Sequence, residues 1–279
     1  MLNYSEGDFK AGKVKIHYYR TGGQKPPFVL LHGATDNGLC WARVAAALAP
    51  DYDVVMPDAQ GHGLSDRIDA DFSPNSFGDL VLALANGLGL KKPIIMGHSM
   101  GAGTAADVAS RHASLPGALI LEDPGWGMPP PSVADTEEAR KRTDAFRAHS
   151  AALRERNLED ILAESRKTDP TWSEEDRGPW ATAKKQFDLS MFSGGARSQR
   201  SYTEIVPLID CPTLLICAEK GIVTAEVAEN AARLWKSKKP FQWVRIMGAG
   251  HNIRREKFEE FLNAVTGFLN EDVKSTDAP

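Results

Sequence analysis

PIIMGHSMGAGTAA, residues 93–106, is the stretch of sequence that decides the fold. Its apolar start predicts a buried strand, the Gly97–Gly101 segment (GHSMG) is a G-x-S-x-G turn, and the small residues after it predict a helix. The serine of such a turn is strained, so the residues two places away on either side must lack side chains that would clash. The following helix would direct its first N–H groups toward a reacting oxygen. Ser99 is therefore predicted to be a nucleophile.

Short apolar runs alternate with amphipathic or alanine-rich segments on both sides of this motif. Continuous β-branched and leucine-rich runs are typical of parallel strands that helices cover on both faces. We expect strands at residues 14–19, 28–32, 53–58, 93–97, 118–122, 213–218 and 242–247. We expect helices at residues 40–48, 77–87, 100–111, 225–235 and 256–269. This alternation predicts an α/β sheet.

The alternation stops between residues 125 and 206, where no convincing strand occurs. Charged helical segments at 134–149 and 153–167 precede an aromatic-rich stretch, residues 172–192. The predicted organisation is an α/β core of residues 1–124 and 207–279 with a helical cap of residues 125–206.

Two loops after expected strands supply further candidate groups. Residues 31–34 (LHGA) follow the second expected strand, and acyl transfer needs two N–H donors aimed at the developing oxyanion. We expect these donors on Ala34 and Met100. Residues 248–252 (GAGHN) follow the last expected strand and place His251 on a glycine-rich loop. Among the seven histidines, His251 has the best setting for a general base.

The chain resembles the α/β-hydrolase superfamily. The resemblance rests on LLHGATDN (30–37), MPDAQGHGLSD (56–66), MGHSMGAG (96–103), LEDPGW (121–126) and MGAGHNIRRE (247–256). It implies an eight-stranded, mostly parallel sheet with a helical cap between strands six and seven. It also implies a catalytic triad in the chain order serine, acid, histidine.

The acid of this triad has three candidates. In many members of the superfamily an aspartate follows strand seven, but matching residues 212–224 (PTLLICAEKGIVT) to that pattern places Gly221 there. Hydrolytic haloalkane dehalogenases and zearalenone-hydrolysing lactonases have a glutamate after strand six, at the position matched by Glu122. We expect Glu122 to be the acid, with Glu219 and Asp123 as alternatives.

A serine nucleophile with this pattern predicts hydrolysis of a carboxylic ester or lactone through an acyl-enzyme. The substrate is expected to carry a hydrophobic group, because the residues expected to line the pocket are mostly apolar or aromatic. They are His32, Leu39, Trp41, His98, Trp126, Trp172, Trp180, Phe187, Met191 and Phe192. Two alternatives remain: a hydrolase of carbon–carbon bonds in diketones, and a weakly catalytic small-molecule receptor.

The composition and charge of the chain indicate which kinds of partner to expect. The chain has 279 residues, 42% hydrophobic and 25% charged, and a net charge of −4, which is ordinary for a globular protein and indicates no nucleic-acid partner. No apolar run reaches the length of a membrane span, and the start lacks the pattern of a signal peptide. With three cysteines, we expect a cytoplasmic protein with reduced thiols. No metal site or cofactor is predicted, the expected partner is a small acyl substrate, and both monomer and dimer remain open.

Overall fold

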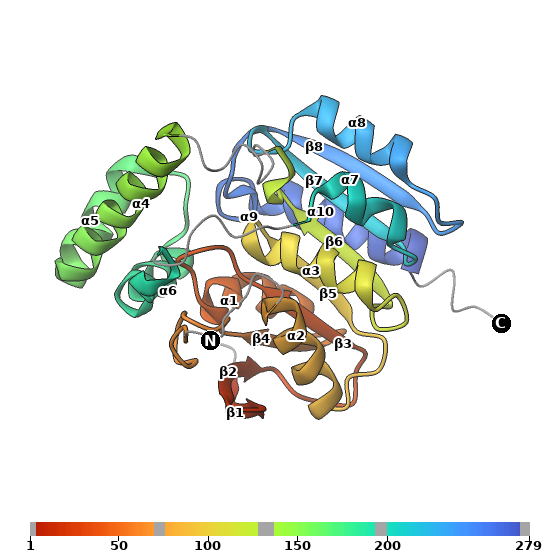
Figure 1. Cartoon of the computed structure of the whole chain (residues 1–279), viewed down its shortest axis with the longest axis horizontal. Coiled ribbons are helices and arrows are strands. Elements are labelled where there is room, and N and C mark those ends of the chain that lie inside the picture. Colours follow the sequence, from red (N-terminus) through yellow and green to blue (C-terminus); the bar gives the residue numbers. More distant parts are fainter. Residues whose placement is uncertain (1–3, 70–75, 128–136, 193–199, 274–279) are drawn as a thin grey trace.

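The computed structural model describes residues 4–69, 76–127, 137–192 and 200–273. An eight-stranded sheet lies at its centre, in the order β1-β2-β4-β3-β5-β6-β7-β8 (Figure 1). From β4 to β8 along this order, neighbouring strands pair in parallel. Strand β2 pairs antiparallel with both of its neighbours, β1 and β4. The strands are β1 Ser5–Ala11, β2 Val14–Arg20, β3 Pro27–Leu31, β4 Asp53–Pro57, β5 Ile94–His98, β6 Ala118–Glu122, β7 Thr213–Lys220 and β8 Phe241–Gly250. The predicted mostly parallel sheet is confirmed.

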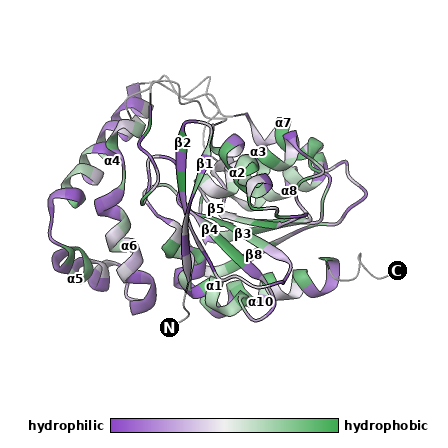
Figure 2. Cartoon of the chain, turned by 90° about the horizontal axis from the view of Figure 1, so that it is seen from below, coloured by the Kyte–Doolittle hydropathy of each residue, from purple (hydrophilic) through white to green (hydrophobic). Residues whose placement is uncertain are grey.

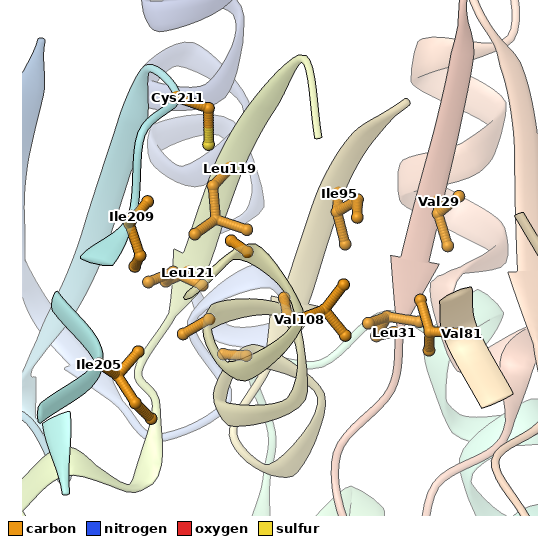
Figure 3. Packing of buried hydrophobic residues seen from close by; sticks show 14 of the residues in the cluster. Val29, Leu31, Val81, Ile95, Val108, Leu119, Leu121, Ile205, Ile209 and Cys211 are labelled. Atoms are coloured by element: carbon orange, nitrogen blue, oxygen red, sulfur yellow. The ribbon is translucent and has the colours of Figure 1, made fainter. Parts of the chain in front are cut away.

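Helices cover both faces of the sheet. Because successive strand residues point to opposite faces, Val29 and Ile95 pack in one apolar cluster (Figure 3) whereas Leu30 and Met96 pack in another. The first cluster lies under α2, α3 and α8, and the second lies under α1 and α10. These helices are α1 Ala42–Leu48, α2 Ser76–Gly87, α3 Met100–Arg111, α8 Ala225–Leu234 and α10 Phe258–Phe268. Shorter helical elements are η1 Gly38–Trp41, η2 Gly125–Gly127, α7 Tyr202–Ile205, η5 Val206–Leu208, α9 Ile253–Glu256 and η6 Leu269–Val273.

Three further helices form a layer beside the sheet (Figure 1). They are α4 Glu137–Glu155, α5 Leu158–Thr168 and α6 Glu174–Gln186, and the short turn η4 Leu189–Phe192 follows them. Figure 2 shows hydrophilic residues over much of this layer. Within the described ranges, every helix is too short or too polar to cross a bilayer.

Helix α6 and strand β1 were absent from the residue-by-residue prediction. Pro179 lies inside α6, and an internal proline ordinarily argues against a helix. The start of α6 does carry a signal, because the Ser173 side chain accepts a hydrogen bond from the Asp176 N–H as an N-cap. The expected helix at 134–149 corresponds to α4, and its residues 134–136 lie outside the described part of the chain.

Candidate active site

Ser99 lies in the sharp turn between β5 and α3, with φ 51° and ψ −112°. This positive φ is unfavourable for a residue with a side chain. The flanking glycines make the turn possible: a Cβ on Gly97 would lie 2.3 Å from the Gly101 carbonyl carbon, and a Cβ on Gly101 would lie 2.1 Å from the Leu31 oxygen. The Ser99 N–H also donates to the Glu122 backbone oxygen at 2.9 Å, so the turn is fixed to the next strand.

Asp123 is the carboxylate that contacts His251. Its Oδ2 lies 2.6 Å from His251 Nδ1, and its side chain is completely buried whereas His251 is 32% exposed. The same carboxylate accepts backbone N–H groups from Ile222 at 2.8 Å and Val223 at 2.9 Å. These contacts fix Asp123, and the bond to Nδ1 leaves Nε2 of His251 available as a proton acceptor.

Glu122 does not contact His251, so the expected position of the acid is wrong. Its Oε1 accepts the Arg254 backbone N–H at 2.9 Å, and its Oε2 accepts from Arg254 Nη1 at 3.0 Å. Burial raises the pKa of Glu122, and the Arg254 charge opposes this shift. The alternative Glu219 accepts the Gly248 N–H at 2.7 Å and is not the carboxylate that binds His251 Nδ1. Only the third candidate, Asp123, makes this contact.

The structure gives a physical reason for the glycine after strand seven. A Cβ on Gly221 would lie 2.5 Å from Asp123 Oδ2. The Asp123 carboxylate, which comes from the end of β6, therefore fills the space where a side chain at position 221 would stand. The segment of residues 212–224 thus has a glycine where many relatives have an aspartate, and the Asp123 carboxylate, which binds His251, occupies the space beside that glycine.

Ser99 and His251 line the same cavity, which has a volume of about 310 Å³. Four more of the expected site residues also line it: Ala34, His98, Trp180 and Phe187. The remaining lining residues are Thr35, Asp36, Phe146, His149, Ser150, Leu153, Lys184, Asn252 and Arg255. The walls thus combine aromatic and aliphatic groups with a charged region.

Several expected pocket residues belong to the interior instead. Trp41 is fully buried, and the Arg254 guanidinium carbon lies over its indole ring, 4.1 Å from the ring centre. Trp126 stacks on Tyr202, and Trp172 packs edge-on against Trp180. Three more expected residues are absent from the walls of the large cavity: His32, Leu39 and Met191. His32 lines a second cavity of about 30 Å³, and the partly buried Leu39 packs against the core. The side chain of Phe192 lies outside the described residues.

Helix α4 contributes four lining residues that the sequence reading missed. Phe146, His149, Ser150 and Leu153 follow the i, i+3, i+4, i+7 spacing of a single helix face. That spacing was a usable signal for a wall of the cavity. Lys184 had no comparable signal, because its partners lie about 150 residues earlier in the chain.

The two segments that carry the expected oxyanion donors approach each other at Ser99. Ala34 lines the large cavity, and Met100 is the first residue of α3. The backbone before Ala34 approaches the serine closely, since a Cβ on Gly33 would lie 3.5 Å from Ser99 Cβ and 2.6 Å from His98 Nδ1. The two expected N–H donors therefore belong to the segments that meet at the serine.

A buried cluster of charges forms part of the cavity wall, through Asp36, Lys184 and Arg255. Asp36 Oδ2 accepts from Arg255 Nη2 at 2.7 Å and from Arg254 Nη2 at 3.2 Å, and Asp36 Oδ1 lies 3.2 Å from Lys184 Nζ. Burial alone would raise the pKa of Asp36, but these three cations outweigh it and hold the pKa well below 3.8. For the buried His98, desolvation and the nearby Arg254 lower the pKa well below 6.5, so its ring is neutral at pH 7.

The fold is that of the alpha/beta hydrolases. Residues 28–264 match the alpha/beta hydrolase family, and the chain belongs to it. N-formylmaleamate deformylase from Pseudomonas putida is 26% identical over 269 residues, which cover 95% of this chain and 96% of the relative.

Two further similarities are narrower in what they show. An uncharacterized protein of Mycobacterium tuberculosis is 36% identical over 107 residues, which are 38% of this chain and only 31% of that protein. The crystal structure of E-2-(acetamidomethylene)succinate hydrolase superposes with a TM-score of 0.74 at 19% identity, covering 96% of this chain and 100% of that one. At this identity the superposition supports the fold alone.

Proposed function

We propose that this chain is a serine hydrolase that cleaves an acyl bond of a small molecule through an acyl-enzyme. One observation supports the proposal most directly: His251 binds Asp123 at 2.6 Å and shares with Ser99 the walls of one cavity. A serine, an imidazole and a buried carboxylate in this order are the groups that acyl transfer requires.

In the proposed reaction His251 Nε2 removes the proton from Ser99 as its Oγ bonds to the carbonyl carbon. The N–H groups of Ala34 and Met100 stabilise the negative oxygen of the tetrahedral intermediate. The protonated His251 then gives its proton to the leaving group as the bond to that group breaks. Water attacks the acyl-enzyme with His251 again as base, and this step releases the acid and restores the serine.

The cavity favours a substrate with an apolar portion. Phe146, Leu153, Trp180 and Phe187 supply aromatic and aliphatic surface to its walls. A carboxylic ester or lactone of a hydrophobic acid fits this surface. An N-acyl compound is a second candidate. The Pseudomonas putida relative, which aligns with this chain over 96% of its own length, is named N-formylmaleamate deformylase.

The test is covalent labelling with a fluorophosphonate probe, together with turnover of a chromogenic short-chain ester. We expect the wild-type chain to gain one probe adduct on Ser99 and to hydrolyse the ester. Ser99→Ala should abolish labelling and lower turnover by at least about 100-fold. Ser110→Ala is the matched control: Ser110 lies in α3, its Oγ donates to the Asp107 backbone oxygen and it is absent from the cavity walls, so both readouts should stay intact.

Absence of ester turnover in both wild type and Ser99→Ala, with no adduct on Ser99, would contradict the proposal and favour a binding protein on this scaffold. The bond class is resolved by assaying an ester, an N-formyl amide and a vinylogous diketone side by side. Faster cleavage of the diketone than of the ester and the amide would instead assign carbon–carbon hydrolysis.

A further inference from the structure

Lys184 is a buried lysine whose ammonium group binds the loop that carries Ala34. It projects from α6, and its side chain is 7% exposed. Its Nζ donates to the Thr35 backbone oxygen at 3.0 Å and to Thr35 Oγ1 at 2.7 Å, and it lies 3.2 Å from Asp36 Oδ1. An ammonium has three N–H donors, so these contacts use all of them and leave none for a substrate.

Thr35 has a backbone conformation that its own side chain disfavours. Its φ is 63°, and β-branched residues rarely adopt this left-handed region. Thr35 is the third residue of a turn that the Asp36 N–H closes by donating to the Gly33 oxygen at 3.2 Å. Turns that need a positive φ at this position usually have glycine or asparagine there. Another group must therefore stabilise threonine in this place, and Lys184 binds it through both oxygens.

The turn determines the direction of the Ala34 N–H. The Gly33 carbonyl and the Ala34 N–H belong to one planar peptide unit and point in opposite directions. The Gly33 oxygen accepts from the Asp36 N–H and from His32 Nδ1, the latter at 2.8 Å. Because both bonds hold the carbonyl oxygen of this peptide unit, they also fix the opposite direction in which its Ala34 N–H points.

The partner of Lys184 also reaches the segment that follows the base. Asp36 binds Arg255 Nη2 at 2.7 Å, and Arg255 Nη1 donates to the Asn252 side chain at 3.0 Å, one residue after His251. Lys184 thus completes a cluster that joins α6, the Ala34 loop and the His251 loop.

We propose that Lys184 is a positioning residue that holds Thr35 in its left-handed conformation and thereby aims the Ala34 N–H at the reacting oxygen. Docking of α6 onto the core and completion of the oxyanion site are then one event. This inference rests on the proposed acyl transfer. Although Lys184 is part of the cavity wall, the inference assigns its ammonium no hydrogen bond to the substrate, so its effect belongs to the transition state.

The test compares Lys184→Met in the wild-type and Thr35→Gly backgrounds, with steady-state ester kinetics and the rate of fluorophosphonate labelling. Lys184→Met should lower kcat about 10- to 100-fold with KM within about threefold, because complete loss of an oxyanion donor costs about 100- to 1,000-fold. Labelling should slow in parallel. In the Thr35→Gly background the same change should cost less than about threefold, because glycine adopts a positive φ without strain.

Lys185→Met is the matched control. Lys185 is the next residue of α6 and donates to the backbone oxygens of Arg154 and Arg156 within the helical layer, so kcat should stay within about twofold. If Lys184→Met does not fold, Lys184→Gln enters the same two backgrounds, and the expected suppression by Thr35→Gly is unchanged.

Three results would overturn the inference: a rise in KM at unchanged kcat, an equal loss in both backgrounds, or labelling of Lys184→Met as fast as wild type. A wild-type chain that neither labels nor turns over would overturn the proposed function as well. The two failures are therefore distinguishable.

Discussion

His98 Nε2 donates a hydrogen bond to the backbone oxygen of His251 at 3.0 Å. The residue immediately before the candidate nucleophile thus binds the backbone of the candidate base, although the two are far apart in sequence. Their rings also lie 4.6 Å apart between centres. A neutral His98 can make this bond without placing a positive charge beside His251, so burial of His98 serves the geometry of the base.

Asp123→Asn should leave the fold intact and lower kcat/KM about 10,000-fold. The amide keeps the shape of the carboxylate but no longer favours the productive tautomer of His251 or stabilises the imidazolium. Ester hydrolysis by the purified variant measures the effect. Glu122→Gln is the comparison, and we expect it to affect stability more than chemistry because Glu122 binds the buried Arg254. Full activity in Asp123→Asn with loss in Glu122→Gln would reverse the assignment.

Gly221→Ala should reduce activity by forcing the Asp123 carboxylate away from His251. The added Cβ would stand 2.5 Å from Asp123 Oδ2, well inside van der Waals contact, and a misplacement of about 1 Å can cost about 100-fold in rate. Gly103→Ala is the control, since a Cβ at that helical position would meet no atom within 4 Å apart from the backbone of its own helix and its chain neighbours. We expect it to keep activity and to raise the melting temperature slightly. Equal kcat in both variants would show that the carboxylate tolerates the methyl group.

His62 should make the protein less stable in mild acid. Burial lowers the pKa of His62 from 6.5 to about 3, so the unfolded chain binds this proton first as the pH falls. The stability from neutral His62 is present above pH 6.5 and is lost progressively from there toward pH 3. Between pH 7 and pH 5 the loss is about 2 kcal/mol.

Urea unfolding of wild type and His62→Gln at these two pH values measures the contribution of His62. The variant should lose about 2 kcal/mol less than wild type between pH 7 and pH 5. His32 and His98 are present in both proteins, so their titration cancels in the comparison. Identical pH dependence in the two proteins would be inconsistent with a buried, neutral His62.

Phe146→Ala should weaken binding of long acyl chains. Phe146 lines the cavity and is 43% exposed, so its contact with a bound chain removes apolar surface from water. We expect KM to rise about fivefold for an octanoyl ester and to change little for an acetyl ester, with kcat nearly constant. Leu158→Ala is the control, because Leu158 is 40% exposed and is absent from the cavity walls. Parallel changes in KM for both variants would remove Phe146 from the binding surface.

The parts of this protein that could be predicted from sequence are those with local signals. The apolar run before Gly97 and the small residues after Ser99 specify strand, turn and helix within a short window. The choice between Glu122 and Asp123 has no such signal. It depends on the φ of 41° at Asp123 and on the space left by Gly221, which comes from a neighbouring strand.

The cavity was predicted less well for a related reason. The residue type alone does not tell whether a tryptophan packs in the core, as Trp41 does, or lines a cavity, as Trp180 does. The face of α4 was accessible through its helical spacing. Lys184 acquires its partners only when α6 lies against the Ala34 loop, a contact that no local pattern encodes.

The backbone of Ser99, at φ 51°, is one that glycine adopts more readily than any other residue. Substitution of Ser99 by glycine would relieve the backbone strain and raise the melting temperature, but it would remove the hydroxyl group. Backbone stability alone would therefore favour glycine at this position, and the proposed role of Ser99 as nucleophile explains why a serine is found there. Engineering that raises the melting temperature through this turn would do so at the expense of the candidate nucleophile.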